Sequence, residues 1–129
     1  MSHQTPRPLQ IIQTTNISLL STGVQTLFTT QNLSGQRFVP VHLVFELITV
    51  SGFTAVPTLS FGQNGGSFND ILGASALTGV SVANNMIAFN LDLTAISTIA
   101  NNVAVGINVT VGATSTTYAG NFYVLGFYR

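Results

Sequence analysis

The sequence has very little charge. Only 5% of its 129 residues are Asp, Glu, Lys or Arg, against about 25% in typical soluble domains. There is no lysine, and the formal net charge is zero. The charged residues, three of each sign, are Arg7, Arg37, Arg129, Glu46, Asp70 and Asp92. Three scattered arginines cannot form the basic surface that phosphate backbones require, so nucleic acid is excluded as a partner.

Cysteine is also absent, which excludes disulfides and thiolate metal sites. The start, "MSHQTPRPLQ", has no apolar core of a secretory signal. The longest apolar run, "FVPVHLVFELITV", contains His42 and Glu46 and is shorter than the roughly 18 residues that would indicate a membrane-spanning helix. We therefore expect neither a secretory signal nor a membrane partner.

A chain without net charge lacks the electrostatic repulsion that keeps copies apart in solution. We therefore expect its working state to be an assembly in which neighbouring proteins cover much of its surface. The alternative is a monomer kept in solution by its many Thr, Ser, Asn and Gln side chains. The length suits a single domain that buries about two-thirds of its unfolded surface, so the fold needs no covalent or metal staple.

Short apolar segments separated by turn residues predict strands. The predicted strands are residues 9–14, 17–21, 24–30, 38–50, 55–61, 86–93, 103–111 and 122–129. Residues 68–74 are long enough for one helical turn, residues 94–102 for a short helix or a loop, and residues 112–121 form a turn-rich connection. The pattern predicts an all-β fold, a single antiparallel β-sandwich or jelly roll of about eight strands.

The clearest strand is "VAVGINVTV" at residues 103–111, where Val and Ile alternate with Ala, Gly, Asn and Thr. The outward positions of a solvated sandwich normally carry Lys and Glu, but here they carry small neutral side chains. Interface cores are depleted in charge, so an uncharged outer face fits a protein that packs against others.

The N-terminal residues predict an extended arm. Pro6 and Pro8 flank Arg7, and each proline favours an extended conformation in the residue before it. We divide the chain into an N-terminal arm, residues 1–15, and a β-sandwich domain, residues 16–129.

The residues that could carry catalysis are few. In an extended strand His42 and Glu46 share a face but stand about 13 Å apart, too far for a catalytic pair. Asp70 and Asp92 lie in unrelated segments, so no carboxylate pair for glycoside hydrolysis is expected. We predict that the protein is not an enzyme.

No cofactor is predicted either. Two histidines without ligand spacing do not make a zinc site. A calcium ion could use Asp70 with Asn64 and Asn69, but a Gly- and Asn-rich turn explains "NGGSFND" better. The same loop is not a phosphate loop, because it lacks the Gly-Lys-Ser/Thr ending.

Two further surface roles are considered. The sequons at Asn16, Asn32 and Asn108 are expected by chance in a chain this rich in Asn, Ser and Thr. Tyr118, Tyr123 and Tyr128 are the best candidates for a sugar-binding platform, because a phenol tolerates both water and apolar surroundings.

The second half of the chain resembles small all-β virion proteins of tailed bacteriophages, including cyanophages. The segments that carry the resemblance are "TLSFGQNGGSFNDILGASALTGV" and "NNVAVGINVTVGATSTTYAGNFYVLGFYR", residues 58–129. Such strings occur in capsid decoration (cement) proteins and in tail or fibre modules. The resemblance carries over no individual functional residue, and residues 1–57 add no motif to it.

The resemblance implies a structural virion protein of the decoration type. Its partners would be the major capsid protein and copies of itself in a homotrimer. The protein would be made in the host cytoplasm and located on the capsid surface of the virion. The alternative is a tail or fibre head module that binds a host-surface glycan. The expected interface contacts, taken from the two ends of the chain, are Arg7, Leu9, Ile11, Ile12, Phe127, Tyr128 and Arg129.

Overall fold

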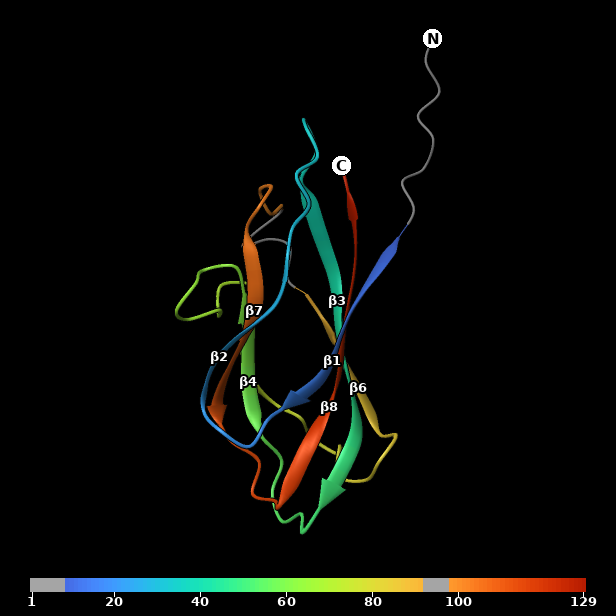
Figure 1. The fold of residues 1–129 in the computed structure, drawn as a ribbon, viewed down its shortest axis with the longest axis vertical. Helices are drawn as coiled ribbons and strands as arrows, with labels where there is room; N and C mark the ends of the chain where they lie inside the picture. Colours follow the sequence, from blue (N-terminus) through green and yellow to red (C-terminus); the bar gives the residue numbers. More distant parts are fainter. Residues whose placement is uncertain (1–8, 92–97) are drawn as a thin grey trace.

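The structure, a computed structural model, describes residues 9–91 and 98–129. Within these ranges the chain forms eight strands and no helix, so the described residues contain no helix that could cross a membrane. The strands are β1 (Gln10–Ser18), β2 (Gly23–Thr29), β3 (Phe38–Ser51), β4 (Thr58–Gly62), β5 (Leu72–Ala76), β6 (Met86–Asn90), β7 (Ala104–Val111) and β8 (Thr117–Tyr128). Figure 1 shows them in two layers of an elongated molecule.

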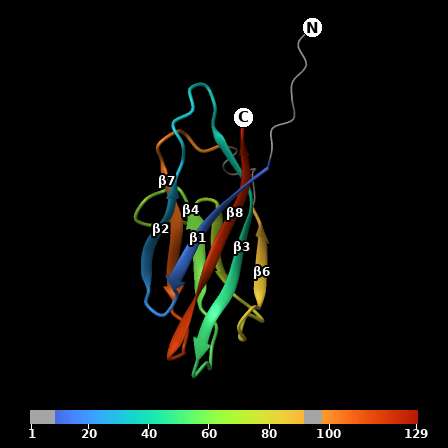
Figure 2. The ribbon, with the colours of Figure 1, turned by 45° about the vertical axis from the view of Figure 1, so that its right-hand side comes forward.

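The two layers are four-stranded antiparallel sheets. Sheet A has the order β1-β8-β3-β6, and sheet B has the order β2-β7-β4-β5. The pairing is nested along the chain: β1 pairs with β8, β2 with β7, β3 with β6 and β4 with β5. Figure 2 shows β1, β8, β3 and β6 side by side. The predicted antiparallel β-sandwich of eight strands is therefore confirmed.

The core lies between the sheets and follows the alternation of side chains along each strand. Strand β8 alternates half-buried and buried residues along its whole length. Its inward Phe122 ring packs on Phe45 of β3, with ring centroids 4.8 Å apart. Buried Leu59, Ile107 and Val109 belong to the same core cluster from sheet B. This continuous core explains how a chain without disulfides can hold two sheets together.

Three sequence predictions need correction. Residues 117–121, predicted as part of a connection, belong to β8, because Tyr118 is fully buried as a core residue. Residues 72–74, predicted within a helical turn, begin β5. The predicted strands at 9–14 and 17–21 join in the single strand β1, whose register shifts between Thr14 and Ile17, where Asn16 has a φ of 57°. The short element predicted at 94–102 falls partly outside the described residues, and residues 98–102 form a bridge and a turn.

Strand β3 explains the longest apolar run of the sequence. It lies between β8 and β6, but β6 pairs only with residues 42–46. Pro40 is the third residue of β3, near its start as expected, and lies outside the β6 pairing. A register shift between Pro40 and His42 breaks the predicted alternation, so Val39 lies opposite Phe127 while Leu43 lies opposite the buried Val124.

Candidate interaction surface

The outer face of sheet A carries very little charge. Its side chains alternate with buried core residues and therefore point away from sheet B. We define this face by the residues Ile11, Gln13, His42, Val44, Glu46, Ile48, Met86, Ala88, Asn90, Ala119, Asn121, Tyr123, Leu125 and Phe127. None of them is a lysine or an arginine, and one is a carboxylate.

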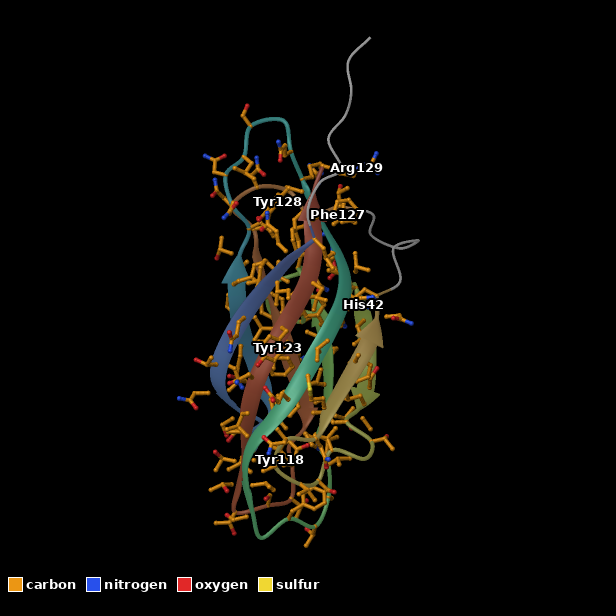
Figure 3. The ribbon with its side chains drawn as sticks, turned by 90° about the vertical axis from the view of Figure 1, so that its right-hand side faces the viewer. His42, Tyr118, Tyr123, Phe127, Tyr128 and Arg129 are labelled. Carbon is orange, nitrogen blue, oxygen red and sulfur yellow. The ribbon has the colours of Figure 1, made fainter. Side chains whose placement is uncertain are left out.

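Cross-strand pairing arranges these side chains in rows. Gln13 lies opposite Tyr123, Tyr123 opposite Val44, and Val44 opposite Ala88. Such a row spans all four strands, so the face is continuous from β1 to β6. Figure 3 looks toward this sheet and places Tyr123 near the middle of β8.

Large apolar side chains are exposed at the margins of this face. Ile11 on β1 is 64% exposed, Met86 on β6 is 56% exposed, and Ile48 on β3 is 41% exposed. Single exposed apolar residues are normal on a protein surface, so we treat this face as a candidate interaction surface because it combines them with very little charge.

The one carboxylate on this face, Glu46, is held by a neighbour. The Tyr123 hydroxyl donates a hydrogen bond of 2.8 Å to Oε1 of Glu46. His42 lies opposite Leu125 and Asn90, four positions along β3 from Glu46. The two therefore share a face at about the expected 13 Å. Within the described residues no group of three or more His, Cys, Asp or Glu side chains could hold a metal ion.

The outer face of sheet B differs because the chain covers part of it. The loop after β4 places the Phe68 ring over Gly106 of β7, where even an added Cβ would meet the ring. Phe68 is buried, and the Ser60 hydroxyl donates a 2.8 Å hydrogen bond to its carbonyl oxygen. Part of the outer face of sheet B is therefore closed by the chain itself.

The loop that was considered for calcium uses its polar groups internally. Asn64 Oδ1 accepts from the backbone N–H of Asn69 at 2.8 Å, and Asn64 Nδ2 donates to Asn69 Oδ1 at 2.7 Å. Asp70 Oδ1 accepts from the Gln63 N–H at 2.8 Å. These hydrogen bonds are those of an Asx turn, in which side chains of the loop bond to its own backbone. The loop thus has the structure of the Gly- and Asn-rich turn that the sequence suggested.

The residues predicted as interface contacts at the N-terminal end differ in how exposed they are. Residues 10–15 belong to β1, and residues 10–14 pair with β8, so this part of the predicted arm is part of the sandwich. Leu9 and Ile11 are exposed, whereas Ile12 packs against the core. Arg7 lies outside the described residues.

The residues predicted as interface contacts at the C-terminal end also differ in exposure. Phe127 is half-buried on the outer face of sheet A, and Arg129 is exposed. Tyr128, by contrast, is 4% exposed, and its hydroxyl accepts a 2.9 Å hydrogen bond from the Gln31 N–H. Tyr128 is therefore a core residue that fixes the loop after β2, and its contact with a partner stays a prediction.

The three tyrosines do not form a sugar-binding platform. Tyr118 is fully buried, and its hydroxyl donates a 2.6 Å hydrogen bond to the Val80 carbonyl. Burial raises its pKa to about 12. Tyr118 and Tyr128 point into the core, whereas Tyr123 points outward, because odd and even positions of β8 face opposite sides. The even spacing of Tyr118 and Tyr128 in the sequence is the signal that could have revealed this.

Comparisons with known proteins identify the fold. No protein-family model matches the chain, and no curated protein matches it in sequence. Among solved structures, a chain of the cyanophage Pam1 capsid asymmetric unit matches with a TM-score of 0.63 and 16% identity, covering 98% of this chain and 89% of that chain. A chain of the Ralstonia phage GP4 capsid matches with a TM-score of 0.60 and 18% identity, covering 98% and 90%.

A third match comes from the acid-stable capsid structure of the Helicobacter pylori bacteriophage KHP30, with a TM-score of 0.61, 17% identity, and coverage of 96% and 91%. The likeness spans nearly the whole length of both chains in each case. The expected resemblance to phage virion proteins is thus confirmed at the level of the fold.

Proposed function

We propose that this chain is a structural protein of a phage virion, of the capsid decoration type, which binds the outside of the shell and stabilises it. The observation that supports this most is the fold likeness to chains of three phage capsid structures, which spans almost the entire chain. The uncharged outer face of sheet A supports it independently, because a surface of this kind is suited to burial against protein.

In this proposal the chain stabilises the capsid through added contacts and not through a chemical reaction. A decoration protein that packs on several shell subunits adds contacts that must break before the capsid opens. The margin residues Ile11, Ile48 and Met86 supply apolar area, and each Å² removed from water contributes about 25 cal/mol. Small neutral neighbours such as Ala88 and Ala119 are desolvated at little cost. A stable interface needs about 1,200–2,000 Å² in total.

The partners in this proposal are the major capsid protein and further copies of the chain, as a homotrimer. Several attachment points per assembly raise the effective affinity without any new kind of contact. The virion surface is the proposed location, after synthesis in the host cytoplasm. No catalytic step and no cofactor is part of the proposal.

Sedimentation tests the proposal. The purified chain is mixed with empty capsids of the phage that encodes it, and capsids are pelleted. Decoration predicts that the chain pellets in a fixed ratio to shell subunits and raises the capsid melting temperature. Light scattering of the free chain tests the trimer separately. A chain that stays in the supernatant at concentrations well above micromolar contradicts decoration.

A further inference from the structure

The loop after β4 contains a chemically reactive pair of residues, Asn64 and Gly65. It is the one place in the chain where glycine follows asparagine. Such a pair is prone to deamidation, because glycine has no side chain that keeps its backbone nitrogen away from the asparagine amide carbon. Both residues are exposed to solvent, and Figure 1 shows this loop at the side of the molecule, beside β7. The pair is therefore a candidate site of covalent modification.

Asn64 supports the loop through its side chain and its backbone. Its Oδ1 accepts from the backbone N–H groups of Asn69 at 2.8 Å and Asp70 at 3.3 Å, and its Nδ2 donates to Asn69 Oδ1 at 2.7 Å. Its carbonyl oxygen accepts from the N–H of Ser67 at 3.1 Å and of Phe68 at 2.9 Å. A change of this one side chain therefore affects the bonds that shape the whole loop.

The loop holds Phe68 in a conformation that needs support. Its φ is 40°, a left-handed value that is unfavourable for a bulky residue. The Phe68 N–H bonds to the Asn64 carbonyl, and the Ser60 hydroxyl donates to the Phe68 carbonyl. The ring is buried and lies over Gly106 of β7. Loss of the bonds from Asn64 would therefore free Phe68 to leave sheet B.

Gly65 is not required by the shape of the loop. A Cβ added to it would meet no atom within 4 Å, and its φ lies outside the left-handed range. The next residue, Gly66, has a φ of 92° and does need to be glycine. Alanine at position 65 would thus remove the reactive pair and leave the fold of the loop in place.

We propose that Asn64 deamidates spontaneously, and that its conversion releases Phe68 from sheet B. The Gly65 nitrogen attacks Cγ of Asn64 and gives up its proton, the Cγ–Nδ2 bond breaks, and ammonia leaves with that proton. The product is a succinimide ring. Water then adds to one of the two ring carbonyls and opens the ring to aspartate or isoaspartate.

Both products disturb the loop. Aspartate places a carboxylate oxygen where Nδ2 now donates to Asn69 Oδ1, so two acceptors face each other without a hydrogen. Isoaspartate lengthens the backbone by one carbon between Asn64 and Gly65, within the turn that bonds to Phe68. In each case the support for the left-handed Phe68 weakens.

The test is incubation of the full chain in mildly alkaline buffer for weeks, followed by peptide mass spectrometry and by binding of a dye that detects exposed apolar surface. We expect Asn64 to convert before any other asparagine, to products that include isoaspartate. Dye binding should rise in proportion to this conversion. Asn64→Asp, which has one product from the start, should bind the dye without incubation and melt at a lower temperature.

The matched control is Gly65→Ala. We expect an unchanged melting temperature and conversion of Asn64 that is slower by about tenfold, because the added Cβ crowds the attacking nitrogen. Equal conversion in Gly65→Ala and the wild type, or conversion of other asparagines while Asn64 keeps its amide, would overturn the site. Conversion without a rise in dye binding would overturn the release of Phe68.

A second variant tests whether the hydrogen bonds of Asn64 slow the reaction in the folded chain. Asn69→Ala removes the acceptor of Nδ2 and keeps the backbone N–H that bonds to Oδ1. We expect Asn64 to convert several-fold faster in this variant than in the wild type when both are folded, and at equal rates in guanidinium chloride. Equal rates in the folded chains would contradict this protection. These measurements use no capsids, so their outcome is independent of the decoration role.

Discussion

At the residue scale, the tyrosines of β8 show how position in a strand decides what a side chain does. Tyr118 and Tyr128 lie at opposite ends of β8, and both point inward. The hydroxyl of each fixes a loop, the first through the Val80 carbonyl and the second through the Gln31 N–H. Buried hydroxyls require such partners, since an unpaired polar group in the core costs about 1–3 kcal/mol. These residues therefore act in stability rather than in recognition.

The first prediction concerns the buried hydroxyl of Tyr118. The variant Tyr118→Phe keeps the ring but leaves the Val80 carbonyl without its 2.6 Å donor. We expect the free energy of unfolding to fall by about 1–2 kcal/mol, measured by urea denaturation. Tyr123→Phe is the matched control, because it removes a hydroxyl from the half-buried outer face and should cost less. Equal losses in the two variants would contradict the role assigned to Tyr118.

The second prediction concerns alkaline pH. An unfolded tyrosine loses its proton near pH 10, whereas burial raises the pKa of Tyr118 to about 12 in the folded chain. Between these values the unfolded state binds fewer protons, so folding stability is complete below about pH 10 and falls as the pH rises toward 12. Denaturation midpoints measured from pH 8 to 11.5 should show this fall. The fall should be smaller in Tyr118→Phe, and an equal fall would contradict the assignment.

The element scale shows what sequence patterns could and could not predict. Alternation predicted β7 almost to the residue, because Val105, Ile107 and Val109 are buried on one face. The same pattern could not predict that β8 starts at Thr117. Ser, Thr and Ala are common in turns, and a distant partner, Ser51 of β3, makes Thr117 a strand residue. The bulge at Asn16 likewise depends on pairing with β8, which local sequence does not encode.

The low charge of the surface could be read from the sequence, and contact of that surface with other proteins stays a prediction. The sequence could not show that the loop after β4 places Phe68 over Gly106 and so covers part of the outer face of sheet B. Of the residues predicted as interface contacts at the chain ends, Leu9 and Ile11 are exposed, and their contact with a partner stays a prediction.

The third prediction tests the outer face of sheet A. The variants Ile11→Lys and Met86→Lys place a charge at exposed positions, so the melting temperature should change little. Capsid binding should weaken by tenfold or more, because burial of an unpaired ammonium is costly, as measured by quantitative sedimentation. Val24→Lys is the control, since Val24 is 46% exposed on β2 of sheet B. A Val24 variant that loses binding as strongly as the other two would place the interface elsewhere.

At the scale of the whole molecule, the proposed assembly on a capsid would account for the low charge of the chain. A compact sandwich of this size is stable without staples, but with a net charge of zero it lacks the repulsion that keeps free copies apart. In the proposed decoration role, assembly on a shell would offset this lack of repulsion, because nearly uncharged faces would become interfaces.

The measurement that tests the central claim most directly is the co-sedimentation of the full chain with empty capsids of its phage. The proposed function predicts saturable binding at a fixed ratio to shell subunits, together with a higher capsid melting temperature. A chain that remains soluble beside the pelleted capsids, and leaves their melting temperature unchanged, would contradict it.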